Sequence, residues 1–221
     1  MYLSRLILNP RNRRAQREIA TPYQMHKSLM RCFPADLDRE RERVLFRVET
    51  SPRGNVPTVL LQSTLEPAWD WLADGGARGY LLETGSPNPA VKQFDLHLAP
   101  GQTLAFRLRA NPTVKRRRER ADGSLRAVRD PIYHEEKQVA WLERKAGAGG
   151  FHIISVRTRS APDVRGWVRR DDVKHKLKLF AVQFDGLLRV DDPDRLRETV
   201  RRGVGSGKGL GFGLFSLARP S

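Results

Sequence analysis

Two consecutive passes of one strand and helix order predict an α+β fold of two tandem ferredoxin-like (β-α-β-β-α-β) domains, with a basic hairpin inserted in the second. Apolar residues that alternate mark the strands, and apolar residues at helical spacing mark the helices. Ala99-Pro100-Gly101 separates the passes, so we expect an N-terminal domain over 1–98 and a C-terminal domain over 102–221. The 221 residues suffice for two domains of this size.

The first pass begins with a strand over residues 1–8 and a polar loop over 9–14. Thr21 as N-cap, Pro22 at the first position and Gln24 closing a capping box predict a helix that ends near Cys32. The remaining expected elements are strands at 43–50 and 58–62 joined by a turn at 52–55, a short helix at 66–72, and a strand at 91–98.

The second pass repeats this order with an insertion. Asp191 or Asp192 is the expected N-cap of its last helix. The expected elements are a strand at 103–110, a hairpin within 113–129, a helix at 133–145, a strand at 150–157, one long strand or a pair turning at Asp185-Gly186 within 174–190, a helix at 191–202, a glycine-rich loop at 203–211 and a strand at 210–217.

The charge balance calls for an anionic partner. Lys and Arg number 41 against 25 Asp and Glu, a formal net charge of +16. Nucleic acid is favoured, because a membrane surface would require a basic amphipathic helix with aromatic anchors. We expect no membrane contact, because no apolar run approaches a membrane span and the N-terminus lacks a signal-peptide pattern. The single cysteine fits a reducing compartment, so we expect a cytoplasmic protein.

The five histidines show no metal-ligand spacing, and we expect neither a metal nor another cofactor. Carboxylates such as Asp171-Asp172 leave a magnesium site open as an alternative.

His26 is the best-placed acid or base. Helical spacing puts it at the edge of the buried face of its helix, with Tyr23, Lys27 and Arg31 further round toward solvent. An imidazole, a phenol and two cations on one surface suit RNA cleavage, in which the ribose 2′-hydroxyl attacks the adjacent phosphorus. The alternative is that His26 is a half-buried packing residue.

The glycine-rich tract at 203–213 is not a P-loop, because Arg202 and Gly209 stand where that motif requires a glycine and a hydroxyl. Its backbone and Lys208 allow close approach to phosphates, although a purely structural loop explains the tract equally well. Three further segments alternate apolar and basic residues and present cationic faces: Arg107 with Arg109, Arg157 with Arg159, and Lys174, Lys176 and Lys178.

The chain resembles the CasE-type CRISPR repeat-processing endoribonucleases of the type I-E Cascade complex, within the RAMP superfamily. The residues that carry the resemblance are MYLSRLIL at the N-terminus, Tyr23-Gln24-Met25-His26, VLLQS at 59–63, FRLRANP at 106–112, QVAWLERK at 138–145 and GVGSGKGLGFGLFSLA at 203–218. The resemblance implies metal-independent cutting at the base of a repeat stem-loop. It implies a 2′,3′-cyclic phosphate and a 5′-hydroxyl as the new ends, a retained crRNA product, and other Cascade subunits as partners in a prokaryotic cell.

The same resemblance implies roles for individual residues. It makes His26 the catalytic histidine, Tyr23 its assistant, and Lys27 and Arg31 phosphate contacts. It also makes the basic insertion a hairpin against the RNA stem, with Lys115, Arg116, Arg117, Arg118, Arg120, Arg126 and Arg129. Arg157, Arg159 and Lys176 are RNA contacts by charge and position. Two alternatives remain: a non-catalytic RNA-hairpin-binding subunit and a basic ribosome-associated protein.

Overall fold

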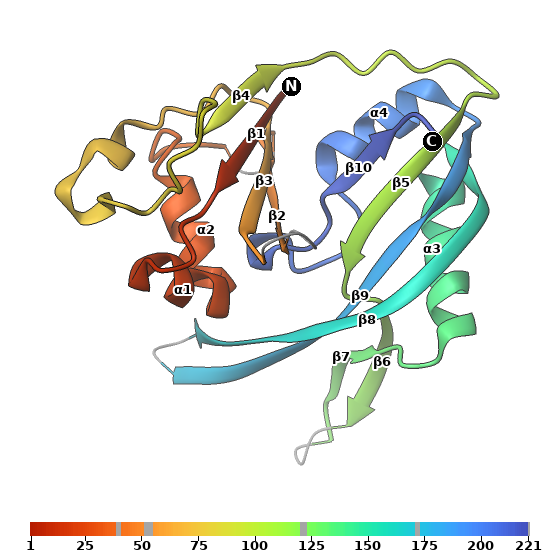
Figure 1. The fold of residues 1–221 in the computed structure, drawn as a ribbon. Helices are drawn as coiled ribbons and strands as arrows, with labels where there is room; N and C mark the ends of the chain where they lie inside the picture. The colour runs from red at the N-terminus through yellow and green to blue at the C-terminus, as the bar shows by residue number, and fades with distance from the viewer. Residues whose placement is uncertain (39–40, 51–54, 120–122, 171–172, 221) are drawn as a thin grey trace.

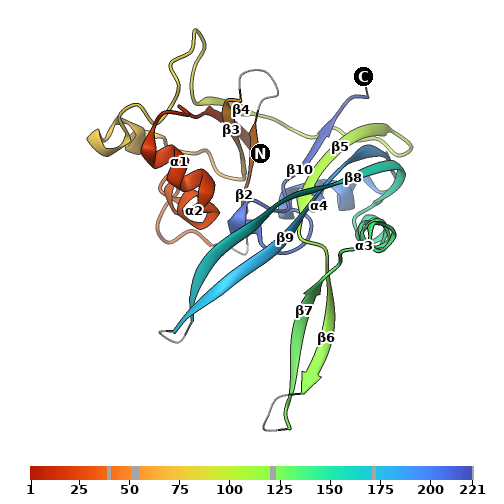
Figure 2. The same ribbon diagram turned by 60° about the horizontal axis from the view of Figure 1, so that its bottom comes forward.

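The computed structural model describes residues 1–221 except 39–40, 51–54, 120–122, 171–172 and 221, and it describes side chains in this range except those of 167–177. Most of the expected 52–55 turn therefore lies outside the described residues. Two four-stranded antiparallel sheets lie side by side, and a two-stranded hairpin projects from the second (Figures 1 and 2).

The first sheet has the order β2-β3-β1-β4. Its strands are β1 (Tyr2–Ile7), β2 (Val44–Thr50), β3 (Pro57–Ser63) and β4 (Ala90–Gln93). Leu6, Phe46 and Leu61 point from it into a core closed by Met25 and Leu29 of helix α2 (Pro22–Met30).

The second sheet has the order β10-β5-β9-β8. Its strands are β5 (Thr103–Ala110), β8 (Phe151–Arg170), β9 (Val173–Val190) and β10 (Phe215–Ala218). Helices α3 (Glu135–Ala148) and α4 (Pro193–Arg202) contribute Trp141, Leu142 and Leu196 to its core.

Both sheets place the first strand of the unit between the fourth and the third, with the second strand at the edge beside the third. This shared order confirms the predicted pair of ferredoxin-like folds. The boundary at 99–101 stays a prediction. Hydrogen bonds join the units: for example, buried Arg47 of β2 donates to the carbonyl of Leu214 at 3.0 Å, and Gln62 of β3 donates to that of Val200 at 2.8 Å.

Several expected elements of the first unit were wrong. The loop expected at 9–14 ends at Asn12, because helix α1 (Arg13–Ala20) begins at Arg13, and its N-cap Asn12 accepts a hydrogen bond from the Ala15 amide. Thr21 makes no side-chain cap bond, because its backbone ends α1 as well as beginning α2, so the capping box does not form.

The expected helix at 66–72 is replaced by two 3₁₀ turns, η1 (Asp70–Ala73) and η2 (Gly75–Ala77). Pro67 removes a backbone donor there, and two glycines follow. Strand β4 is also shorter than the expected 91–98, and β10 is shorter than 210–217.

In the second unit, the inserted hairpin is confirmed as β6 (Thr113–Glu119) paired with β7 (Leu125–Pro131). Asp192 caps α4, accepting from the amides of Asp194 and Arg195. The expected alternative of a turn at Asp185-Gly186 was wrong, because β9 runs straight through it. A side chain at Gly186 would lie 2.1 Å from the Ser155 carbonyl, so the glycine makes room for an irregularity in β8.

Strand β8 is much longer than the expected 150–157. Strand β9 pairs with β5 only from Val182 onward. The part of β9 before Val182 pairs with β8 alone, and this two-stranded ribbon extends to α2 of the first unit, as Figures 1 and 2 both show.

Candidate nucleic-acid interface

Helix α2 presents Tyr23, His26 and Lys27 together. The Tyr23 side chain is exposed, and the Lys27 Nζ lies 5.1 Å from the centre of its ring. This cation–π contact holds a positive charge beside the phenol. Tyr23 and Lys27 of the predicted set are therefore adjacent on this helix, and their action together with His26 stays a prediction.

The imidazole of His26 lies between the first sheet and the glycine-rich loop. Its ring stacks against Phe46 of β2, with centroids 6.3 Å apart and planes inclined by 15°. On the loop side, a Cβ added to Gly209 of η3 (Lys208–Leu210) would lie 3.4 Å from His26 Nε2. The glycine thus allows the loop backbone to approach a ring nitrogen closely.

A cavity of about 170 Å³ opens beside His26. Lys208 and Gly209 line it from the loop, and Arg43 lines it from the segment before β2. The Arg43 Nε is buried and has no hydrogen-bond partner within the described part of the chain. Burial, reinforced by the positive charges of Arg43, Arg202 and Lys145, lowers the pKa of Lys208. The cavity is thus suited to an anion.

A buried polar network links α2 to α1 and to Tyr80. The Glu18 carboxylate, 5% exposed, accepts hydrogen bonds from Ser28 Oγ at 2.6 Å, Tyr80 Oη at 2.6 Å and Arg14 Nε at 2.8 Å. Burial and the bond to Glu18 raise the pKa of Tyr80, so its hydroxyl remains a donor. A buried carboxylate with three donors is well compensated, and it fixes the helix that carries His26.

Arg31, the fourth predicted residue of this helix, is turned toward the 3₁₀ segment. Its Nη2 lies 2.6 Å from Asp74 Oδ2, and its guanidinium lies 5.2 Å from the centre of the Trp71 ring. Arg31 is therefore held by protein partners, although its side chain is still 46% exposed.

A basic groove of about 1300 Å³ adjoins the His26 cavity and shares Arg43 and Lys208 with it. We use the name "basic groove" for the surface whose cationic residues are Arg43, Lys115, Arg129, Arg144, Lys145, Arg195, Arg202 and Lys208. Glu198 is the acidic residue among those that line it, and it pairs with Arg201 and Arg202. The groove runs from the base of the β6–β7 hairpin past α3 and α4 to the glycine-rich loop.

Comparison with known proteins decides the family. A family model described as CRISPR associated protein matches residues 1–219. The chain belongs to this family. The CRISPR-associated endoribonuclease Cse3 of Thermus thermophilus is 38% identical, over 99% of this chain and 100% of the relative. The CRISPR system Cascade subunit CasE of Escherichia coli is 33% identical over 99% of each chain.

Solved structures of the family agree with the fold. The structure of Cse3 bound to a 19-nucleotide RNA has a TM-score of 0.78 at 38% identity, covering 99% of this chain and 100% of that one. The Thermus thermophilus Cse3 complex with an RNA representing a pre-cleavage state has a TM-score of 0.76 at 38% identity, with 98% of each chain covered.

The inserted hairpin of this CRISPR-associated chain has two different basic faces. Pairs directly opposite each other share a face. Lys115 faces Arg129 and Arg117 faces Ala127, which makes one face that continues into the basic groove.

The second face of the hairpin bears Arg116, Arg118 and Arg126. Asp130 lies on it and accepts from Arg118 at 3.0 Å, with Arg116 Nε 3.7 Å away. Strand geometry therefore divides the basic residues of the hairpin between two faces. Arg120 lies outside the described residues.

The predicted arginines of the second sheet lie apart from the His26 cavity. Asp185 accepts from Arg107 Nε at 2.6 Å and from Arg159 Nη2 at 2.7 Å, while Arg109 donates to the Pro162 carbonyl at 3.0 Å. These three line a separate cleft between the first sheet and β8. Arg157 is exposed, and the Lys176 side chain is outside the described set. Their contact with RNA stays a prediction.

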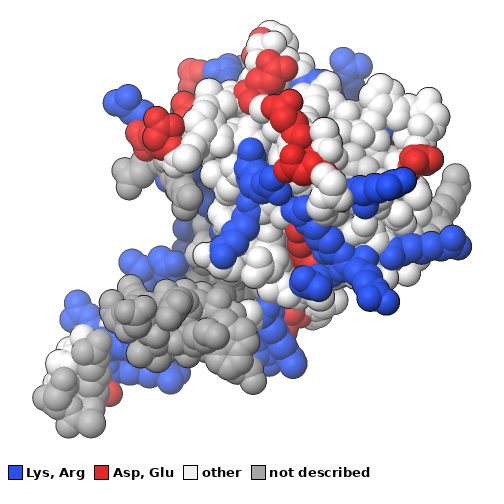
Figure 3. Space-filling view, turned by 90° about the vertical axis from the view of Figure 1, so that its left-hand side faces the viewer, with Lys and Arg blue, Asp and Glu red and all other residues white. Residues whose placement is uncertain are grey.

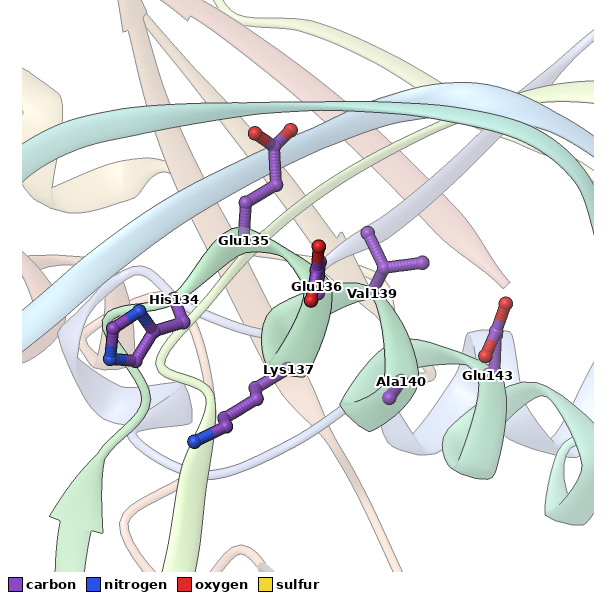
Figure 4. Close-up of a pocket in the computed structure, with 7 residues that line it drawn as sticks. All are labelled: His134, Glu135, Glu136, Lys137, Val139, Ala140 and Glu143. Atoms are coloured by element: carbon purple, nitrogen blue, oxygen red, sulfur yellow. The ribbon is translucent and has the colours of Figure 1, made fainter.

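A shallow depression on the outer side of α3 differs from the basic groove in having mainly acidic side chains in its lining (Figure 4). Glu135, Glu136 and Glu143 line it, so it would repel phosphates.

Among the residues that the structure describes, no three His, Cys, Asp or Glu side chains are placed to hold a metal ion. No described helix is long and apolar enough to cross a membrane.

Figure 3 views the side of the molecule that is on the left in Figure 1. Lys and Arg side chains are spread over this face, with a row of acidic side chains between them. Positive charge is therefore not confined to the basic groove.

The sequence analysis missed five cations of the basic groove: Arg43, Arg144, Lys145, Arg195 and Arg202. For two of them the sequence did contain a signal: Arg195 and Arg202 are seven residues apart, which predicts that they share one basic face of their helix. Arg43 gave none, because it reaches the groove through the packing of the two units.

Proposed function

We propose that the chain is a metal-independent endoribonuclease that cleaves CRISPR precursor RNA at the base of the repeat stem-loop. The observation that carries this proposal is that the His26 cavity and the basic groove lie next to each other and share Arg43 and Lys208 in their linings. An acid–base group thus stands where a bound duplex would end.

The reaction uses a nucleophile that RNA itself supplies. The 2′-oxygen forms a bond to the adjacent phosphorus, and the bond from phosphorus to the 5′-oxygen of the next nucleotide breaks. The products are a 2′,3′-cyclic phosphate and a 5′-hydroxyl. One proton leaves the 2′-hydroxyl and one reaches the departing 5′-oxygen, and His26 serves as a proton-transfer residue. Tyr23 orients the 2′-hydroxyl by hydrogen bonding, and Lys27 offers positive charge beside it.

The basic groove binds the stem. The bases of an A-form helix are hidden in a deep, narrow major groove, so protein contacts go chiefly to phosphates and shape. Cations from the hairpin base, α3 and α4 can follow one phosphate backbone toward His26. The relatives include a Cascade subunit, and we infer that this chain retains its crRNA product within a Cascade-type complex.

Cleavage in EDTA tests the proposal. The protein is incubated with a CRISPR repeat hairpin RNA from its own source organism in excess EDTA. We expect one cut at the base of the stem. The downstream fragment should be phosphorylated by polynucleotide kinase without prior phosphatase treatment, because it carries a 5′-hydroxyl. Tight binding of RNA that remains intact would instead support a non-catalytic hairpin-binding subunit.

A further inference from the structure

The glycine-rich loop contributes a lysine to the cavity that contains His26. Lys208 begins η3, and the next residue, Gly209, is the one whose backbone approaches His26 Nε2. Lys208 also lines the basic groove, so it stands where the groove meets the His26 cavity. An RNA strand that ran from the groove to His26 would lie beside this side chain.

The charges around Lys208 are nearly all of one sign. Besides burial, the positive charges of Arg43, Arg202 and Lys145 lower its pKa. Within the described residues, its ammonium forms no ion pair or hydrogen bond. Of its neighbours, Arg202 is paired with Glu198, whereas Arg43 keeps a buried Nε without a partner. Half-buried cations that lack a counter-ion are unfavourable in the free protein, and an anion relieves this cost.

Among the described residues, the nearby acid forms no ion pair with Lys208. Glu42 lines the same cavity, but its carboxylate accepts a hydrogen bond from Thr64 Oγ1. The small volume beside His26 suits a single phosphodiester group better than a stacked base.

We propose that Lys208 is a catalytic residue whose ammonium contacts a non-bridging oxygen of the scissile phosphate. This inference rests on the proposed function. Charge builds on those oxygens as the 2′-oxygen bonds to phosphorus and before the 5′-oxygen departs, and a fixed cation stabilises that state most. Lys208 remains protonated throughout and transfers nothing.

Separate measurements of rate and affinity test this role. The cleavage rate is measured in a single turnover at saturating protein, and affinity is measured with RNA that carries a 2′-deoxyribose at the scissile nucleotide. Lys208→Ala should slow the saturated rate about 100-fold. It should weaken affinity far less, because one of several phosphate contacts is lost. Exposed Lys92 of β4 provides the matched control, and Lys92→Ala should change neither value.

Chemical rescue separates the charge from the shape of the side chain. Lys208→Cys treated with 2-bromoethylamine regains an ammonium at the position of the lysine Nζ. The native Cys32 is 3% exposed, and burial raises the pKa of its thiol to about 12, so it should not react in the folded protein. We expect the untreated variant to be slow and alkylation to restore most of the rate.

The outcomes are distinguishable. Full-rate cleavage by Lys208→Ala at saturation, with His26→Ala inactive, would overturn the role of Lys208 and leave the proposed function standing. Failure of the wild-type protein to cut would overturn the proposed function itself. If Lys208→Ala melts at a lower temperature than wild type, the rescue of Lys208→Cys decides, and no gain of rate on alkylation would overturn the inference.

Discussion

The two units of the molecule share one strand order, but they differ in their helices and in the segments added to their sheets. In the first unit, the second helix is reduced to the turns η1 and η2, and α2 carries His26 and Tyr23. In the second, both helices are complete, and a basic hairpin and the long β8–β9 ribbon are added. All the cations of the basic groove except Arg43 come from the second unit. On this difference we propose that the first unit supplies the proton-transfer residue, His26, while the second supplies the cations that bind the RNA and, through Lys208, contact the scissile phosphate.

Of the substitutions considered, loss of the His26 imidazole should reduce the cleavage rate most. His26→Ala should lower the saturated cleavage rate by at least about 100-fold, because general acid–base catalysis contributes about that much or more. Affinity should change little, since one imidazole adds little to phosphate binding. Both values come from the assays described for Lys208. Equal losses of rate and affinity would contradict the division between the units.

The hairpin offers a matched comparison within the second unit. Replacing Lys115, Arg117 and Arg129 by alanine removes three charges from the face that continues into the groove, and replacing Arg116, Arg118 and Arg126 removes three from the other. The first set should flatten the slope of log affinity against log salt by about two to three, at about 0.7 to 0.9 for each phosphate contact.

The second set should leave the salt slope nearly unchanged, with affinity measured at several salt concentrations. Equal slopes for both sets would mean that the RNA does not distinguish the faces. No change from either set would make the hairpin a solvated surface only.

Tyr23→Phe sharpens the account of the first unit. A phenol is protonated at neutral pH and is a poor base, so Tyr23 is expected to assist. One lost hydrogen bond costs about 0.5–1.5 kcal/mol, which corresponds to about tenfold or less in the saturated rate. A Tyr23→Phe variant slower than His26→Ala would reverse the two roles.

Asp185 should affect stability and leave the chemistry unchanged. Burial alone would raise the pKa of Asp185, but hydrogen bonds from Arg107, Gln183 and Arg159 lower it below its usual value. Its carboxylate therefore stabilises the fold above the ordinary carboxyl pKa, and this stabilisation is lost as pH falls through the lowered pKa.

Asp185→Asn should reduce the free energy of unfolding at pH 7 by about 1 kcal/mol or less. The gap from wild type should narrow below about pH 4, as denaturant unfolding at several pH values would show. A constant gap would mean that the carboxylate charge is not its cause.

The sequence predicted what local patterns determine. Thr21-Pro22 marked the start of α2, and alternation marked β1 and β5. Helix α1 was missed because its sequence is mostly polar and its buried side consists of Ala15 and Glu18, whose burial depends on partners distant in sequence. The length of β8 and the placing of Arg43 depend on contacts between units, which no local pattern records.

We propose that the RNA's own 2′-hydroxyl is the nucleophile at the site built around His26. A hairpin RNA with one 2′-deoxyribose at the scissile nucleotide tests it most directly. The account predicts that wild-type protein binds this RNA as tightly as the all-ribose hairpin and leaves it intact through many turnover times. Cleavage of the deoxy substrate at the normal rate would contradict the account.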